Sequence, residues 1–306
     1  MQFFYRVGRS LKYRSIYLAH RLVPWFSRQN YGRLLRKLGR RFVQTRVGKM
    51  QMWIDLQSEL GQYFFIHHQY EPFETRLIAQ AALPGTVAVD VGANIGYYTL
   101  ILAASVGATG TVIAIEPDPT NMSLLTRNLA LNRASNVIYR QVAVLGYEGQ
   151  ATLYRSETND GDHRVFDARD DDRFNNGVAR TRVPVQTIVL DNYLARIGKP
   201  AGLVKMDIQG AEMLALPGMT QTLANPNVIL FCEFWPYGLR QAGSDPMQFL
   251  KSLQELGLVL FEIVEAKQIV VPITIDELAH RFNDADYTNL ICVHPSQIPH
   301  TSFLNV

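Results

Sequence analysis

Apolar runs of strand length alternate with helix-length segments along most of this chain. Strands are predicted at Val43–Val47, Met50–Leu56, Val87–Asp90, Thr111–Ile115, Val137–Val144, Ala151–Tyr154, Arg182–Ile188, Leu203–Ile208, Val228–Phe234, Leu258–Ile263, Gln268–Ile273 and Thr288–His294. Helices are predicted at Pro72–Ala82, Tyr97–Ser105, Pro119–Leu131, Leu190–Ile197, Ala211–Leu216, Pro246–Leu256 and Asp276–Phe282. This alternation predicts an α/β fold with a mostly parallel sheet and helices on both of its faces.

Two of the predicted strands end in residues that suit a nucleoside. Asp90 closes one strand, Gly92 and Gly96 then frame a short turn, and Glu116 followed by a proline ends the next strand. Open α/β sheets bind ligands at the carboxyl ends of their strands. Glycines allow the backbone to approach a ligand closely, and a carboxylate at a strand end can accept hydrogen bonds from ribose hydroxyls. The sequence therefore predicts a nucleoside-binding site here.

The spacing of the glycines bears on which nucleoside binds. A dinucleotide fingerprint reads G-x-G-x-x-G, whereas this loop has only Gly92 and Gly96, with Ala93 and Asn94 between them. A carboxylate at Asp90 suits an ammonium group better than a pyrophosphate. S-adenosylmethionine meets both demands, because it carries a ribose and a zwitterionic methionine tail but no phosphate. NAD(P) and a βαβ unit without any ligand are the alternatives.

Composition indicates a folded, globular protein. The chain has 306 residues, of which 47% are hydrophobic and 19% charged, enough for one large or two modest domains. Cys232 and Cys292 lie in apolar runs, so they are expected to be buried free thiols in a reducing compartment. No run of 18 apolar residues predicts a transmembrane helix, and the N-terminus lacks the pattern of a secretory signal. We therefore expect a cytoplasmic protein.

Charge is distributed unevenly along the chain. Residues 1–49 contain thirteen Lys or Arg and no acid, whereas the remainder carries seventeen basic and twenty-seven acidic residues. Residues 1–42 are predicted to be a basic amphipathic helical extension, and residues 43–306 the main domain. The extension is typical of an arm that packs on its own acidic domain or on a partner in a homodimer. It also suits peripheral contact with an anionic membrane at its inner face, while nucleic acid is the least favoured partner.

Four motifs in order resemble one known family. They are D-V-G-A-N-I-G at Asp90–Gly96, I-E-P-D-P at Ile115–Pro119 with Asn128 and Asn132, Q-T-I-V-L-D-N-Y-L at Gln186–Leu194, and L-V-K-M-D-I-Q-G-A-E at Leu203–Glu212. From about Tyr70 to Phe261 the chain resembles the FkbM family of S-adenosylmethionine-dependent methyltransferases. The first 40 residues have no counterpart in the family core, and Ile208-Gln209 stands where the family usually has Val-Glu.

The resemblance implies a fold, an activity and a donor site. The fold is the Rossmann-like class I methyltransferase fold, a seven-stranded sheet with its last strand antiparallel. The activity is usually O-methylation of sugars or small natural products, as in polysaccharide biosynthesis. Asp90, Gly92, Ala93, Asn94 and Gly96 would cradle the methionine part of the donor, Glu116 would hold the ribose, Pro117 would direct the chain, and Ala143 would lie near the adenine. Helix capping is the alternative role for Asp90 and Glu116.

The chemistry of methyl transfer to a hydroxyl asks for alignment and for removal of one proton. By the resemblance, Lys205, Asp207 and Glu212 flank the strand end toward which the methyl group points. The candidate bases are Asp207, Glu233, His163 and the pair His67-His68, and the choice between Asp207 and His163 stays open. Glu212 has an alternative role in the first turn of a helix. If Gln62–His68 is extended, His67 and His68 point to opposite faces and cannot both serve one site.

The acceptor is less well defined by the sequence. Aromatic residues before the core and after the strand that ends at Phe234 suit a saccharide or another polar metabolite, although such residues are more often core: Tyr63, Phe64, Phe65, Tyr70, Phe73, Phe234, Trp235 and Tyr237. No obligatory metal is predicted, and the acidic run Asp170–Asp172 is interpreted as a solvated turn within the long polar segment Arg155–Arg182. The rival functions are an RNA 2′-OH methyltransferase, an NAD(P) oxidoreductase and a non-catalytic, membrane-associated binding module.

Overall fold

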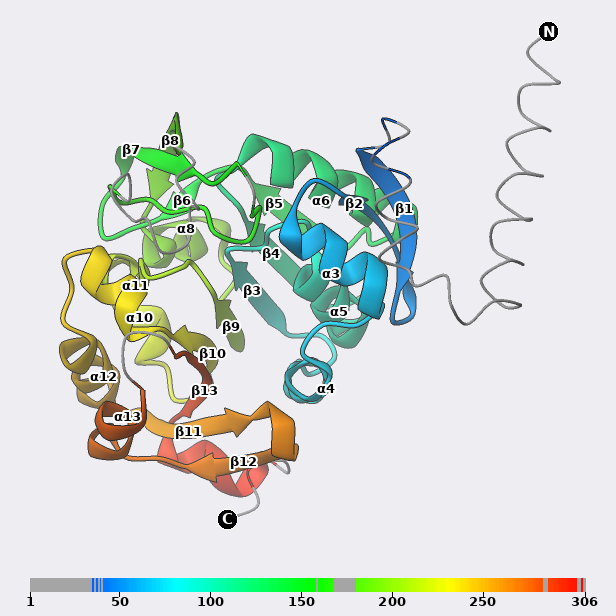
Figure 1. The fold of residues 1–306 in the computed structure, drawn as a ribbon. Helices are drawn as coiled ribbons and strands as arrows, with labels where there is room; N and C mark the ends of the chain where they lie inside the picture. The colour runs from blue at the N-terminus through cyan, green and yellow to red at the C-terminus, as the bar shows by residue number, and fades with distance from the viewer. Residues whose placement is uncertain are drawn as a thin grey trace, which may run out of the picture.

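The computed structural model describes residues 35, 37, 39, 41–157, 159–167, 180–282, 286–301 and 304. Most of the predicted extension and the acidic run Asp170–Asp172 lie outside these residues. The described chain folds around an eight-stranded sheet with helices on both faces (Figure 1). Each described helix is too short or too polar to cross a membrane.

The large sheet has the strand order β12-β11-β13-β10-β9-β3-β4-β5. Five strands are parallel neighbours: β3 (Val87–Val91), β4 (Thr111–Ile115), β5 (Val137–Arg140), β9 (Leu203–Met206) and β10 (Ile229–Phe234). The final strand, β13 (Thr288–Val293), is antiparallel to β10 and to β11 (Val259–Val264). The predicted seven-stranded sheet with an antiparallel last strand is therefore confirmed, and β12 (Ile269–Pro272) adds an eighth strand at the edge.

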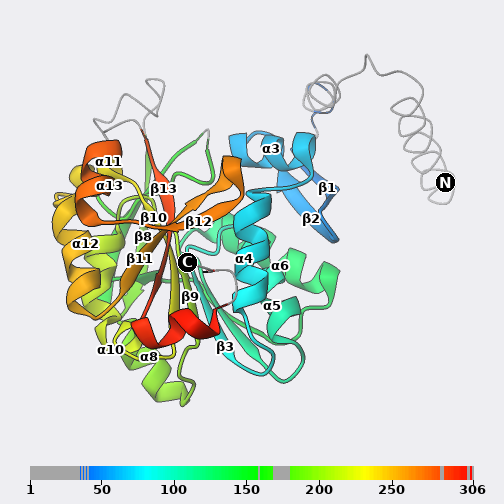
Figure 2. The ribbon, with the colours of Figure 1, turned by 90° about the horizontal axis from the view of Figure 1, so that it is seen from below.

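Helices bury both faces of this sheet (Figure 2). One face is covered by α4 (Pro72–Ala81), α5 (Tyr97–Val106) and α6 (Pro119–Asn132), and the other by α8 (Leu190–Ile197), α10 (Thr220–Leu223) and α12 (Pro246–Glu255). Successive residues of β3 face opposite sides, so Ala88 belongs to one core and Val89 to the other. Strands buried on both faces explain why the central runs are almost wholly apolar.

The remaining elements join these layers. They are α9 (Glu212–Ala215), α11 (Pro236–Gln241), α13 (Ile275–Arg281) and 3-10 turns at Leu216–Gly218, Glu265–Lys267 and Pro295–His300. The predicted hairpin forms from β1 (Phe42–Val47) and β2 (Met50–Asp55). Cys232 on β10 and Cys292 on β13 are buried free thiols, as predicted.

One predicted strand is wrong. The single strand Val137–Val144 is divided, because the chain leaves the large sheet after Arg140. Ala143 and Val144 then form β6, which pairs with β8 (Thr181–Ile188) in a three-stranded sheet completed by β7 (Gly149–Arg155).

Gln62–His68 is helical rather than extended. It belongs to α3 (Glu59–His67), whose N-terminus is capped by Ser58 and whose C-cap is His68 in a left-handed conformation. A Cβ on Gly61 would lie 1.9 Å from the carbonyl oxygen of Asp55, so this helix packs directly on the end of β2. Phe64 is buried on α3 and belongs to the core. The aromatic run is therefore a core-facing part of a helix, although its composition is typical of a strand.

Candidate active site

A cavity of about 500 Å³ lies at the carboxyl ends of β3, β4, β9 and β10. Eleven of the predicted site residues line it: Asp90, Gly92, Ala93, Asn94, Glu116, Pro117, Ala143, His163, Lys205, Asp207 and Glu233. Gly96 and Glu212 do not; Gly96 is the N-cap of α5 and packs toward Leu125 of α6. The structure therefore brings the predicted donor and base candidates to one cavity.

The glycine loop is shaped by contact with the neighbouring strand. Gly92 has φ +84°, and a Cβ there would lie 1.9 Å from the carbonyl oxygen of Asp207. Gly96 has φ +89° and Asn94 has φ +49°, so three of five successive residues adopt conformations that favour glycine. The loop after β3 thus lies directly against the turn after β9.

Glu116 connects the tip of β4 to this loop. Its Oε2 accepts the backbone N–H of Asn94 and its Oε1 accepts that of Asp118, both at 2.8 Å. Burial raises the pKa of Glu116 to about 8, although the N–H of Asp118 acts in the opposite direction. Asp118, not Glu116, caps α6, because its carboxylate accepts the N–H groups of Thr120 and Asn121.

The buried carboxylate of Asp90 is only partly hydrogen bonded. One carboxylate oxygen accepts the hydroxyl of Thr99 at 2.6 Å, whereas Oδ1 is buried without a hydrogen-bond partner among the described residues. Burial raises the pKa of Asp90, while Lys205 on the adjacent strand lowers it. Asp90 caps no helix, since α5 begins at Gly96 without a side-chain cap. A buried, unpaired carboxylate oxygen beside a cavity is suited to a cationic ligand group.

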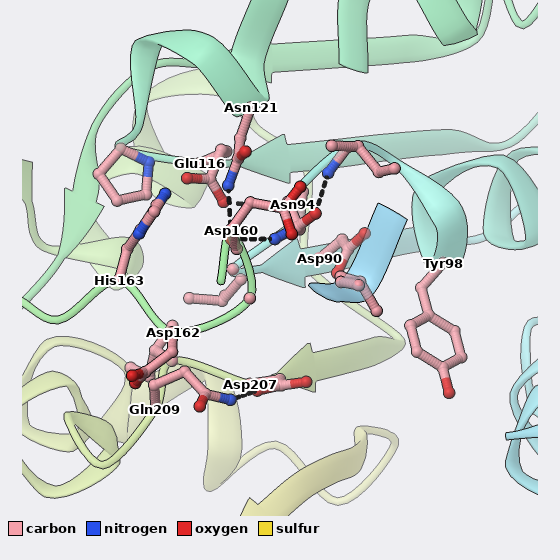
Figure 3. Close-up of a pocket in the computed structure, with 18 of the residues that line it drawn as sticks. Asp90, Asn94, Tyr98, Glu116, Asn121, Asp160, Asp162, His163, Asp207 and Gln209 are labelled. Atoms are coloured by element: carbon pink, nitrogen blue, oxygen red, sulfur yellow. Dashed lines mark hydrogen bonds between the residues drawn. The ribbon is translucent and has the colours of Figure 1, made fainter. Parts of the chain in front are cut away.

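Part of the long polar loop is hydrogen bonded to the glycine loop. The carbonyl oxygen of Asp160 accepts the side-chain amides of Asn94 at 2.7 Å and of Asn121 at 2.9 Å (Figure 3). The Asp160 carboxylate accepts the hydroxyl of Ser58, at the start of α3. Burial raises the pKa of Asp160 to about 7, against the hydrogen bond from Ser58. Asp160 is not among the predicted site residues, because it lies in a polar segment with no apolar periodicity.

His163 belongs to this same loop and faces Asp118. Its Nδ1 accepts the backbone N–H of Ser156 at 3.1 Å, and its Nε2 lies 3.8 Å from a carboxylate oxygen of Asp118. Asp118 also pairs with Arg155. Burial lowers the pKa of His163 to about 4, despite the nearby Asp118 charge, so the imidazole is neutral at pH 7. None of these partners belongs to β9 or β10.

Asp207 and Glu233 are bridged by Gln209. The amide Nε2 of Gln209 donates to Asp207 Oδ1 at 2.9 Å and to Glu233 Oε2 at 3.4 Å. Gln209 has φ +56°, an uncommon conformation for a non-glycine residue, which is often found at functional sites. Figure 3 shows Asp207 and Gln209 together, across the cavity from Glu116, Asn94 and Asn121. The unusual Gln at this motif position was the only sequence signal for the bridge.

Glu212 stabilises the turn after β9 by accepting hydrogen bonds from its backbone. It is buried, and its Oε1 accepts the N–H groups of Ile208 at 3.2 Å and Gly210 at 3.3 Å. A Cβ on Gly210 would lie 2.3 Å from the carbonyl carbon of Gly238 in α11. Glu212 does not line the cavity, so its contacts support the structural alternative.

Lys205 lies among several acids. Its Nζ is 3.2 Å from Asp207 Oδ2 and 4.5 Å from the ring centroid of Tyr98. The hydroxyl of Tyr98 donates to Glu71, and the Asn289 amide donates to both Glu71 and Glu74. Burial lowers the pKa of Lys205, but Asp207 and other acids reverse this effect, so its pKa lies above the ordinary value. Burial raises the pKa of Glu71 and of Glu74.

Aromatic side chains form part of the wall. Tyr63, Phe64, Tyr70 and Trp235 line the cavity, whereas the other aromatics considered above do not: Phe65, Phe73, Phe234 and Tyr237. Tyr287, near the start of β13, also lines it and is 54% exposed. Among the described residues, no three His, Cys, Asp or Glu side chains converge as a metal site requires.

A sheet of this order, with a ligand-sized cavity at its strand ends, defines a class I methyltransferase fold. Residues 90–260 match the family model described as the methyltransferase FkbM domain, and the chain belongs to that family. The predicted family and fold class are thereby confirmed, and the predicted cofactor, S-adenosylmethionine, is the one that belongs to this class.

The chain is also similar to individual methyltransferases. It is 28% identical over 187 residues to the hexuronic acid methyltransferase AglP of Haloferax volcanii, covering 60% of this chain and 67% of that protein. It is 29% identical over 146 residues to Methyltransferase 1 of Beauveria bassiana, covering 43% of this chain and 57% of that one. The crystal structure of Methyltransferase FkbM from Methylobacillus flagellatus has a TM-score of 0.43 and 15% identity, covering 75% and 52%. The chain thus spans little more than half of two of these three proteins.

Proposed function

We propose that this chain is an S-adenosylmethionine-dependent O-methyltransferase that acts on a hydroxyl of a sugar, a glycan or a small polar metabolite. The observation that carries this proposal is one cavity with two chemically different ends. Glu116 and Asn94 lie on one side, and Asp207, which Gln209 bridges to Glu233, lies on the other. Membership of a methyltransferase family and the similarity to a hexuronic acid methyltransferase support it.

The donor end fits the zwitterionic tail and ribose of S-adenosylmethionine. Asp90 Oδ1, which lacks a partner among the described residues, would accept a hydrogen bond from the ammonium group. Gly92, Ala93 and Asn94 would cradle the methionine part, and Glu116 would accept the ribose hydroxyls. Ala143 lines the cavity and would lie near the adenine, and Pro117, which also lines it, would direct the chain after Glu116. When bound, the cofactor supplies a methyl group already activated on a positive sulfonium.

Asp207 is the base that the geometry favours. Its side chain is 30% exposed and lines the cavity, and Lys205 and Gln209 hold its two oxygens in place. Burial and the Asp207 charge raise the pKa of Glu233 well above its usual range, and its contact with Gln209 is the longer of the two, at 3.4 Å. The Nδ1 of His163 is already hydrogen bonded to Ser156. Asp207 therefore takes the proton from the acceptor hydroxyl as the methyl group is transferred.

Some predicted properties stay predictions. Homodimer formation and peripheral contact with the inner face of a membrane depend on residues 1–42, most of which lie outside the described chain. The division between this extension and a domain at 43–306 is likewise untested.

Donor binding and methyl transfer test the proposal separately. Purified protein is titrated with S-adenosylmethionine and with S-adenosylhomocysteine in a calorimeter, and one saturable site is expected for each. Labelled methyl groups are then offered with a panel of glycosides, and the products are treated with alkali. A methyl ether on a hydroxyl survives this treatment, whereas a methyl ester on a carboxylate is hydrolysed. Absence of donor binding, or a wholly alkali-labile product, would overturn the proposal.

A further inference from the structure

The described lining of the cavity contains more acidic than basic side chains. Its described lining includes seven acids, Glu59, Asp90, Glu116, Asp160, Asp162, Asp207 and Glu233, but Lys205 is the only Lys or Arg in that lining. Asp162 is neutralised by Arg164 and Arg180, at 2.7 and 2.5 Å. His163 also lines the cavity, but its imidazole is neutral at pH 7 because burial lowers its pKa to about 4.

Lys205 is not available to bind an anion. Its ammonium contacts the carboxylate of Asp207 and the face of Tyr98, and Asp90 is its cross-strand neighbour. Glu71, which accepts a hydrogen bond from the hydroxyl of Tyr98, is a further acid beside this ring. An acceptor carboxylate or phosphate near this lysine would therefore meet Asp207 as well, and the two like charges would repel each other.

The acids at this end of the cavity act on one another. Burial raises the pKa of Glu233 well above its usual range, and the charge of Asp207 adds to the effect. Burial and the charge of Glu71 act in the same direction on Glu74. Burial is the larger cause of both shifts, but a neighbouring acid contributes to each, and an anionic ligand beside Asp207 would meet the same repulsion.

We infer that the acceptor end of this cavity takes an uncharged, hydroxyl-rich saccharide ring and selects against a uronic acid. This inference rests on the proposed function and names the class of its acceptor. It also sets this chain apart from the relative named as a hexuronic acid methyltransferase.

The lining suits such a ring in two ways. Asp207 and Glu233 present oxygens at the cavity that can accept hydrogen bonds from neighbouring hydroxyls. Tyr70, Tyr287 and Trp235 line the same cavity, and their rings offer apolar faces for the carbon skeleton of a sugar. Carboxylate oxygens and aromatic faces together serve a neutral polyol without requiring a cation.

Two matched ligands test the inference through binding alone. The ligands are p-nitrophenyl glucoside and p-nitrophenyl glucuronide, each as both anomers. They differ only at one position, where the glucoside has a hydroxymethyl group and the glucuronide has a carboxylate. Each is titrated into the full chain saturated with S-adenosylhomocysteine, and saturation-transfer NMR follows binding. We expect the glucoside to bind at least roughly tenfold more tightly than the glucuronide.

The Asp207→Asn variant makes the test specific to this site. It removes the charge that opposes the anion and releases Lys205, so the preference for the glucoside should fall to about threefold or reverse. Glu255→Gln, at an exposed position on α12, removes a distant charge and should leave the preference unchanged.

Three results would overturn the inference. They are glucuronide binding as tight as that of the glucoside, a preference that survives Asp207→Asn, and no binding of either glycoside. If donor binding persists in any of these cases, the inference fails while the proposed methyltransferase function stands. Loss of donor binding would remove both.

Discussion

The backbone N–H of Asn94 donates to Glu116 Oε2 over 2.8 Å, which ties the glycine loop to the acid at the tip of β4. The same asparagine uses its side-chain amide to hold the carbonyl of Asp160. Three segments separated in sequence, the loop after β3, the end of β4 and the loop after β7, therefore meet around Asn94. Glu116 therefore positions this loop, in addition to its proposed role in binding the ribose.

Replacing Glu116 by Ala should weaken donor binding at least tenfold. The change removes the proposed partner of the ribose hydroxyls and leaves the N–H groups of Asn94 and Asp118 without their acceptor, and hydrogen bonds to a charged group contribute about 1.5–3 kcal/mol each. Calorimetry with S-adenosylhomocysteine measures the effect, with Glu255→Gln as the control. Unchanged affinity in a variant that retains its melting temperature would show that the ribose assignment is wrong.

Donor affinity should increase with pH up to about 8 and then level off. Burial raises the pKa of Glu116 to about 8, so this group is largely protonated at pH 7 in the free protein. Ribose hydroxyls donate more strongly to the carboxylate than to the acid, and binding therefore selects the ionised form. The dissociation constant should fall by up to about tenfold per pH unit below 8.

The Glu116→Gln variant isolates this effect, because glutamine does not titrate. Asp160, whose pKa burial raises to about 7, titrates in a similar range and is present in both proteins. The pH dependence that remains in Glu116→Gln therefore reports the other groups. Equal slopes in the two proteins would contradict the prediction.

The donor end could be predicted because its signals are local. Asp90, the two glycines and Glu116 each lie at a strand end, where alternation of strands and helices already places them at one edge of a parallel sheet. The structure adds the reason for Gly92, since a side chain there would meet the backbone of Asp207. That contact joins two strands from distant parts of the sequence, and no local pattern indicates it.

The loop over the cavity and the aromatic helix could not be predicted for the opposite reason. Asp160 is held through its backbone carbonyl, so the identity of its side chain is a weak signal. The helix α3 contains an aromatic run with strand-like propensity, and its conformation is decided by the Ser58 cap and by packing of Gly61 on Asp55. Tertiary contacts outweigh local preference at both places.

Gly92→Ala should destabilise the protein by about 3 kcal/mol or more. The methyl group would overlap the carbonyl oxygen of Asp207, and alanine also disfavours φ +84°. Gly48→Ala is the matched control, because Gly48 has φ +56° but nothing within 4 Å of an added Cβ. It should cost about 1 kcal/mol from conformation alone. Urea unfolding compares the two, and equal losses would show that contact with Asp207 is unimportant.

Asp207→Asn and His163→Ala should separate the two candidate bases. Once an acceptor is in hand, Asp207→Asn should lower kcat about 100-fold or more, with donor affinity changed less than about threefold. His163→Ala should lower kcat much less, because the imidazole contacts Ser156 and Asp118 rather than the end of β9. Single-turnover rates with donor titrations measure both effects. A collapse confined to His163→Ala would assign the base to the histidine.

Gln209→Glu should shift the pH dependence of turnover upward. Gln209 now donates to Asp207 and Glu233, whereas a glutamate would place a third acid between them and leave both without this donor. A negative charge placed between two acids disfavours ionisation of the cluster as a whole, because like charges repel. Turnover should fall at pH 7 and partly recover above pH 8, while Gln209→Ala should lose activity without that recovery. If the pH–rate profile of Gln209→Glu coincided with that of the unsubstituted protein, the hydrogen bonds from Gln209 would have no effect on the base.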